Sequence, residues 1–160
     1  MSTAPRVLVL PRLDDESDNE FFGALTVELD PQPVMSLGSI GSELPMNTWV
    51  AAVCLAIAKS GPAFDPIHLI ARGEVAERLA AIAFAQRAAR RPVQSYVICD
   101  AVPSGQFVDW PDAPVSVVRT NPLLTSHVST QARLRGWEFV SSSNESAPED
   151  IANLIRAHNP

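Results

Sequence analysis

The chain has 160 residues, of which 46% are hydrophobic and 19% are charged, as is typical of a globular protein with a substantial core. Its 18 acidic and 12 basic side chains give a formal net charge of −6 at pH 7, which argues against a nucleic-acid partner. The longest apolar run, residues 49–58, is about half of the ~20 residues that a membrane span requires, so we expect no membrane partner.

The cysteines and the first residues indicate a cytoplasmic protein. Cys54 and Cys99 both lie inside apolar segments, which predicts buried free thiols. The N-terminal residues 1–10 lack the layout of a signal peptide, because their apolar stretch is too short. The arginines outnumber the single lysine, Lys59, and alanine and proline are abundant, a bias typical of a GC-rich, actinobacterial-like genome.

Apolar runs alternate with helix-like segments along the chain. The expected strands are residues 6–10, 24–29, 67–70, 94–99, 115–118 and 137–140. The expected helices are residues 47–59, 74–91 and 129–135 and a last one that begins near Pro148, with a helix or loop over 14–23 and an aperiodic loop over 30–45. The sequence therefore predicts one α/β domain, residues 1–160, in which a mostly parallel sheet of about six strands forms a three-layer sandwich.

Three local patterns resemble the C-terminal half of a small α/β-hydrolase. Residues 67–73 are similar to the strand that leads into the nucleophile turn, and residues 96–101 to the next strand, which often ends in an acidic residue. Residues 110–115 and 132–137 look like the late strand-helix-strand segment of compact bacterial members. The resemblance implies a compact α/β-hydrolase-like fold, although the N-terminal third matches only in outline.

The catalytic triad that this resemblance implies is incomplete. Gly73 takes the position of the nucleophilic serine in the turn. The loop after the last strand, residues 141–146, would carry the catalytic histidine and contains none, while His68, His127 and His158 all lie elsewhere. Since two of three parts are missing, we expect a pseudoenzyme rather than a serine hydrolase that works through an acyl-enzyme.

Five residues are candidates for ligand binding: Arg72, Gly73, Glu74, Asp100 and His127. The turn at Gly73 exposes backbone N–H groups to an anionic or carbonyl oxygen, and Arg72 adds a planar pair of donors. Asp100 ends a buried strand at the sheet edge where α/β proteins bind ligands, and His127 follows the fifth strand. Structural roles are the alternative: Glu74 in a first helical turn, Arg72 in an ion pair and Asp100 in a turn.

Three kinds of function follow from these residues. The first is a small-molecule-binding or accessory protein, and the second is a non-covalent lyase, isomerase or cyclase with Glu74 or His127 as acid or base. The third is a protein-protein role, as a homodimer or as the partner of a larger enzyme. Exposed apolar side chains at residues 21–22 or on the long helix would favour that third role.

No cofactor or metal is expected. Residues 36–42 are rich in glycine and serine but lack the lysine of a phosphate-binding loop. The histidines, cysteines and carboxylates show no metal-ligand spacing. The basic cluster of Arg87, Arg90 and Arg91 falls at the end of an expected helix, where cations complement the helix dipole.

Overall fold

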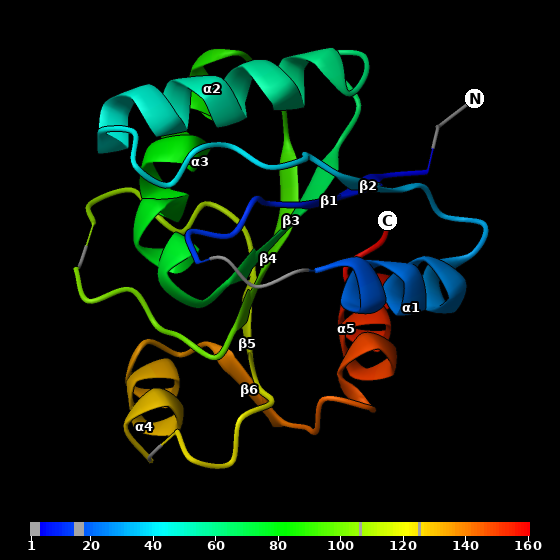
Figure 1. Cartoon of the computed structure of the whole chain (residues 1–160), viewed down its shortest axis with the longest axis vertical. Coiled ribbons are helices and arrows are strands. Elements are labelled where there is room, and N and C mark those ends of the chain that lie inside the picture. The colour runs from blue at the N-terminus through cyan, green and yellow to red at the C-terminus, as the bar shows by residue number, and fades with distance from the viewer. Residues whose placement is uncertain (1–3, 15–17, 106, 125) are drawn as a thin grey trace.

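The structure, a computed structural model, describes residues 4–14, 18–105, 107–124 and 126–160. In chain order the elements are β1 Arg6–Val9, α1 Asn19–Leu29, β2 Val34–Ser36, α2 Met46–Lys59, β3 Ile67–Arg72, the 3-10 helix η1 Gly73–Arg78, α3 Leu79–Ala88, β4 Val93–Cys99, β5 Val115–Arg119, α4 Ser126–Leu134, β6 Glu138–Ser141 and α5 Ala147–Ala157. The six strands of the described residues form one sheet in the order β2-β1-β3-β4-β5-β6, and all neighbours pair in parallel (Figure 1).

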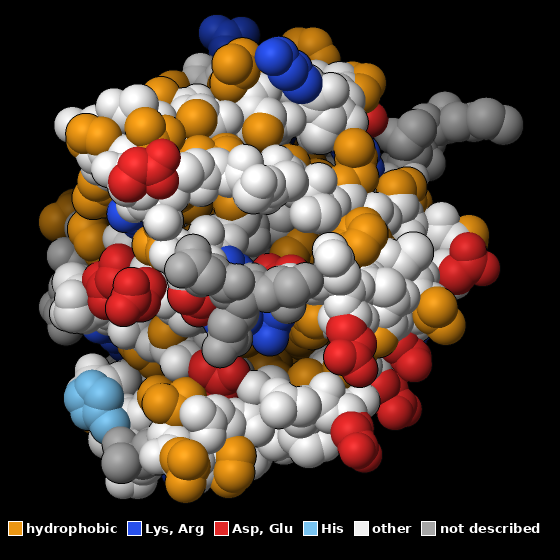
Figure 2. Space-filling view, in the orientation of Figure 1, with side chains coloured by type: hydrophobic (Ala, Val, Ile, Leu, Met, Phe, Trp, Pro, Cys, Tyr) orange, Lys and Arg blue, Asp and Glu red, His pale blue; other side chains and the backbone are white. Residues whose placement is uncertain are grey.

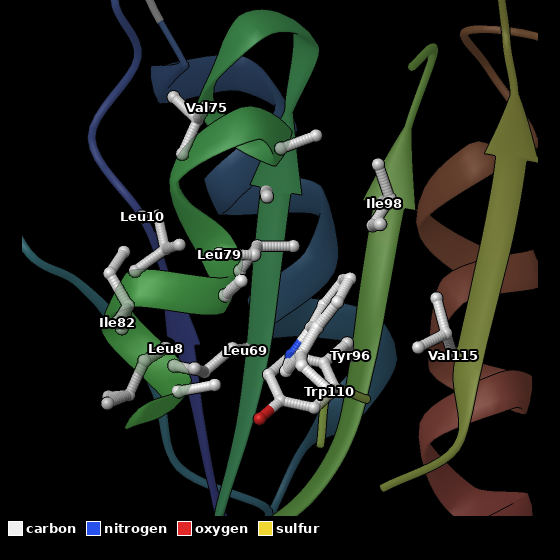
Figure 3. Packing of buried hydrophobic residues seen from close by; sticks show 14 of the residues in the cluster. Leu8, Leu10, Leu69, Val75, Leu79, Ile82, Tyr96, Ile98, Trp110 and Val115 are labelled. Atoms are coloured by element: carbon white, nitrogen blue, oxygen red, sulfur yellow. The ribbon is translucent and has the colours of Figure 1, made fainter. Parts of the chain in front are cut away.

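Each face of the sheet has its own buried cluster, because successive strand residues point to opposite faces. On one face Leu8 and Leu69 pack with side chains of α2, η1, α3 and α4, and Figure 3 shows them beside Leu79 and Ile82. On the other face, Val7 belongs to a cluster formed with α1 and α5. Helices therefore cover both faces, and the predicted three-layer α/β sandwich is confirmed.

The strand predicted over residues 24–29 is wrong, because these residues complete helix α1. Leu25 and Leu29 are buried, and Phe21, four residues before Leu25, packs against the same cluster. This spacing of four is helical, and it outweighs the short β-like alternation. The second strand of the sheet is β2, which lies within the segment predicted as an aperiodic loop.

Two helices differ from their expected bounds. The helix expected over residues 74–91 begins as the 3-10 helix η1, and its α-helical part ends at Ala88. Helix α4 begins at Ser126, so His127 lies in its first turn and not in the preceding loop. Residues 1–3 and 15–17, on which the expectations about a signal peptide and about residues 14–23 partly rest, lie outside the described residues. In the described ranges no helix has the length and apolar character to cross a membrane.

The order of the strands creates a topological switch point between β1 and β3. The chain passes from β1 through α1 to β2 on one side, and it later returns to β3 on the other side of β1. Helix α1 and the η1–α3 segment consequently leave the sheet toward opposite faces. Open α/β sheets bind ligands at such a point, beyond the carboxyl ends of the strands.

A buried polar network joins the middle of the sheet to two distant segments. His68 in β3 is fully buried, and its Nδ1 lies 2.8 Å from the Ser95 hydroxyl oxygen. Its Nε2 lies 2.9 Å from Oδ1 of Asn159, whose Nδ2 donates to Gln32 Oε1 at 3.2 Å. Burial lowers the pKa of His68 below its ordinary value of 6.5, and the nearby His158 adds to this effect. The folded protein therefore favours the neutral ring.

Stability is expected to fall as the pH drops below about 6.5, because the unfolded chain then binds a proton that folded His68 resists. Such a group changes the free energy of unfolding by at most about 1.4 kcal/mol per pH unit. Thermal unfolding between about pH 5 and pH 8 tests this, a range in which histidines titrate. The His68→Gln variant should show a flatter pH dependence, whereas His127→Gln, an exposed control, should follow the wild type. An unchanged slope in His68→Gln would contradict the expectation.

Candidate functional site

Two adjoining cavities form a groove at the carboxyl edge of the sheet. The first, here called the turn lobe, has a volume of about 500 Å³ and is bordered by Gly73, Asp100 and Asn121 among others. The second, the helix lobe, has a volume of about 390 Å³ and lies against the first turns of α1 and α5. Arg72, Thr120 and Asn144 border both lobes. The groove thus lies at the edge where the switch point predicts a ligand.

The backbone turns sharply at Gly73, between β3 and η1. Arg72 is extended, with φ −118° and ψ 127°, and Gly73 then adopts a left-handed φ of 65°. A Cβ atom built on Gly73 would meet no atom within 4 Å outside its two chain neighbours. The nucleophile turn of an α/β-hydrolase is likewise a sharp, strained strand-to-helix turn. This turn therefore leaves open space at the position where the resemblance implies a nucleophile.

Arg72 is held between α1 and the segment that follows β1. Its guanidinium donates to the Asp18 carboxylate and forms an ion pair with it, and Arg12 lies 3.4 Å from the same oxygen. The guanidinium carbon of Arg72 also lies 4.2 Å from the centre of the Phe21 ring, within the range of a cation-π contact. Arg72 therefore forms the predicted ion pair and also borders both lobes of the groove.

Asp100 holds the loop that follows β5. One carboxylate oxygen accepts from the backbone N–H groups of Thr120 at 2.6 Å and Asn121 at 3.1 Å. The other accepts from the Thr120 hydroxyl at 2.5 Å. The Asp100 backbone is left-handed, with φ 59°, which aims the side chain along the neighbouring strand end. Asp100 therefore borders the turn lobe, and its main role is to hold Thr120 and Asn121, which form one wall of that lobe.

Two asparagines supply amide groups to the turn lobe, and the sequence analysis did not single them out. Asn121 directly follows Thr120 at the end of β5, and its Oδ1 accepts from the Leu123 N–H at 2.9 Å, which leaves its Nδ2 hydrogens for the lobe. Asn144 lies exposed in the loop after β6. Both residues lie just beyond the carboxyl end of a parallel strand. That position in the sequence could have identified both as candidate site residues.

The structure brings three of the five candidate residues together. Arg72, Gly73 and Asp100 border the turn lobe, whereas Glu74 and His127 border neither lobe and are both exposed. Glu74 lies in the first turn of η1, and His127 in the first turn of α4. A role for either as acid or base stays a prediction.

The aromatic pair Phe21-Phe22 is half-buried and packs against the α1/α5 cluster. It therefore lacks the exposure that would favour a protein-protein role at this position. The long helix does carry an exposed apolar side chain, Phe84 on α3, and Leu55 on α2 is exposed as well. In Figure 2, acidic side chains lie along the side of the molecule formed by α1 and α5, and others lie on the opposite side and near the centre of this face. The homodimer and partner-enzyme hypotheses stay predictions.

Neither of the two cysteines has a reactive thiol. Cys99 borders the helix lobe, yet it is almost fully buried, and burial raises the pKa of its thiol to about 12. Cys54 is only partly buried, not buried as predicted, and this partial burial raises the pKa of its thiol. Both thiols stay protonated near neutral pH, so neither is a nucleophile there. Within the described ranges no group of three or more His, Cys, Asp or Glu side chains is placed to hold a metal ion.

The all-parallel six-stranded sheet with helices on both faces matches the α/β-hydrolase-like fold that the sequence resemblance implied. Among solved structures, the chain is similar to the Vlm2 thioesterase domain with genetically encoded 2,3-diaminopropionic acid, bound with a dodecadepsipeptide. The TM-score is 0.64 at 12% sequence identity, over 98% of this chain and 94% of that chain. At this identity the similarity shows the fold alone. No family model and no curated protein sequence matches the chain.

Proposed function

We propose that this protein binds a small molecule in the groove and does not act through a Ser-His-Asp triad. The observation that carries the proposal is that Gly73, Asn121 and Asn144 border one lobe. They follow β3, β5 and β6, the places and chain order in which the resemblance implies nucleophile, acid and base. Glycine offers no hydroxyl, and an asparagine amide neither gains nor loses a proton near neutral pH. The lobe therefore keeps the form of a substrate pocket without the groups of acyl transfer.

The groove suits an elongated ligand with an oxygen-rich head and an apolar tail. The turn lobe offers hydrogen-bond donors from Asn121, Asn144 and Arg72, which fit a carbonyl or carboxylate oxygen. The helix lobe adds apolar surface from Phe21 and Pro148. An ester, an amide or a carboxylic acid with an apolar chain combines both features, and this protein would bind such a molecule without cleaving it.

Replacing Arg72 by Ala is expected to weaken ligand binding about ten- to hundredfold, because a charge-assisted hydrogen bond is lost. Native mass spectrometry of gently isolated protein would first identify a retained small molecule by its mass. Titration calorimetry with that compound would then compare the wild type with Arg72→Ala. Arg133→Ala is the matched control, because Arg133 is exposed on α4 and borders neither lobe.

The two possible failures are distinguishable. Equal affinity in the wild type and in Arg72→Ala would place the ligand outside the groove. Spectra that contain only protein assemblies, without a retained small molecule, would overturn the proposal and favour the homodimer or accessory role. Thermal unfolding of Arg72→Ala must remain cooperative for the comparison to count, and we expect this because Asp18 keeps Arg12 as a partner.

A further inference from the structure

A second hollow, rich in arginine, lies at the opposite edge of the sheet, where β3 and β4 begin. It has a volume of about 370 Å³ and is lined by Phe64, Arg87, Arg90, Arg91, Pro92 and Asp112. We call it the arginine hollow. It shares no lining residue with the groove. The chain has a net charge of −6, yet three arginines line this one hollow. The dipole of a single helix does not account for all three.

Two neighbouring guanidinium groups, Arg91 in the hollow and Arg6 beside it, are buried without forming an ion pair with a described residue. Arg91 is 5% exposed and Arg6, directly behind it, is 8% exposed. Both donate to the carbonyl oxygen of Pro62, Arg91 at 2.8 Å and Arg6 at 3.3 Å. Within the described residues neither forms an ion pair with a carboxylate, and Arg6 Nε has no hydrogen-bond partner. Burial and the neighbouring Arg6 lower the pKa of Arg91, and the Asp65 carboxylate opposes this effect without forming an ion pair within 4 Å. Because buried charges are normally paired, two neighbouring cations near one unpaired carboxylate leave an excess of positive charge that favours an anion here.

Arg90 carries a second, independent signal. It follows the end of α3 with a left-handed φ of 56°, a position where helices usually place glycine. Its exposed side chain lines the hollow, and its guanidinium makes no hydrogen bond or ion pair with the described residues. A left-handed φ at a non-glycine residue is unfavourable for the fold, and such residues cluster at functional sites, so we count the backbone of Arg90 in favour of a ligand-binding role.

The remaining charges of the hollow already compensate each other. Arg87 lies 3.3 Å from the Asp112 carboxylate, and it also donates to the Asp109 carbonyl at 2.6 Å. Asp112 additionally accepts from the Tyr96 hydroxyl at 2.7 Å. The excess positive charge therefore belongs to Arg90 and to the buried pair behind it. An excess of two or more charges matches a dianion such as a phosphate monoester.

We propose that the arginine hollow binds a phosphate-bearing small molecule, with its phosphoryl group on Arg90 and Arg91 and its planar or apolar part against Phe64. Planar guanidinium groups match phosphate oxygens in a bidentate manner. The Phe64 side chain is 78% exposed at the mouth of the hollow, where it can stack on a ring of the ligand. This site is independent of the groove, so the failure of one proposal leaves the other intact.

Titration of the ¹⁵N-labelled protein with inorganic phosphate and with phenyl phosphate, at constant ionic strength, tests the proposal by NMR. We expect saturable shifts at the backbone amides of Phe64, Arg90 and Arg91, and none at Gly73 or Asn144. The Arg90→Gly variant should bind both probes about tenfold more weakly. Its unfolding midpoint should stay equal or rise, because glycine adopts a left-handed φ freely. If Arg90 had only a structural role, its replacement would not weaken phosphate binding while the unfolding midpoint stayed equal or rose.

Two further variants sharpen the result. The wild type should bind phenyl phosphate about two- to tenfold more tightly than inorganic phosphate, because Phe64 stacks on the phenyl ring. Phe64→Ala should bind the two probes with equal affinity. Arg133→Gln, an exposed arginine on α4, should bind both probes as the wild type does. The proposal is overturned if chloride at the same ionic strength reproduces the shifts, or if Arg90→Gly binds phosphate as tightly as the wild type.

Discussion

A variant that combines Gly73→Ser, Asn121→Asp and Asn144→His is expected to hydrolyse an activated ester such as p-nitrophenyl acetate. All three positions border the turn lobe, and a side chain at position 73 has open space before it. We expect hydrolysis about 10²- to 10⁴-fold faster than with Gly73→Ser alone, the usual effect of a general base. The left-handed φ of 65° costs the new serine about 1–2 kcal/mol of stability. Release of nitrophenolate, followed by absorbance, measures the rate.

The neighbouring residue Ser143 provides a matched control for the histidine. Its hydroxyl lies 2.8 Å from that of Ser146, and it borders neither lobe of the groove. A triple variant with Ser143→His in place of Asn144→His should therefore be no faster than Gly73→Ser alone. Equal activity with either histidine would mean that the chemistry does not occur in the turn lobe.

Replacing Asp100 by Ala is expected to lower the free energy of unfolding by about 3 kcal/mol. The variant loses a carboxylate that accepts three hydrogen bonds from Thr120 and Asn121. It also places an alanine at a φ of 59°, a conformation that alanine avoids. Urea denaturation measures the loss. Because Asp100 fixes the wall of the turn lobe, the same variant should also weaken ligand binding.

The Asp100→Gly variant separates the two causes. It loses the same hydrogen bonds, but glycine adopts the left-handed φ without strain, so it should be about 1 kcal/mol more stable than Asp100→Ala. If Asp100→Ala were as stable as the wild type, the three hydrogen bonds of the carboxylate would make no net contribution to stability. Asp100 would then be a pocket residue alone.

The parallel sheet could be predicted because its strands are buried on both faces and so read as continuous apolar runs. β1 is buried at all four positions, and β3 at five of six. The pattern fails for β2, which has three residues and none of them fully buried. The second half of α1, residues 24–29, is predicted wrongly as a strand, because Leu25 and Leu29 are the only two buried residues of the helix. A strand or helix that buries so few residues has only a weak hydrophobic periodicity in its sequence.

The candidate site was predictable only where polar residues directly follow predicted strands. Arg72, Gly73 and Asp100 meet that condition, and all three border the turn lobe. The helix lobe could not be foreseen, since Phe21 belongs to α1, for whose residues the sequence predicts a helix or loop over 14–23 followed by a strand over 24–29. Contacts between distant segments, such as Asp18 with Arg72, follow from tertiary packing and leave no local pattern.

Because α1 packs on α5, the second core cluster closes only after α5 has been synthesised. Leu25 and Leu29 leave the ribosome early, while Ile151 and Ile155 follow on the order of ten seconds later at ordinary rates of elongation. During that interval the nascent chain can assemble α2 and α3 on β1, β3 and β4. The helix lobe, bordered by the first turns of α1 and α5, therefore cannot form before the C-terminal helix has been synthesised.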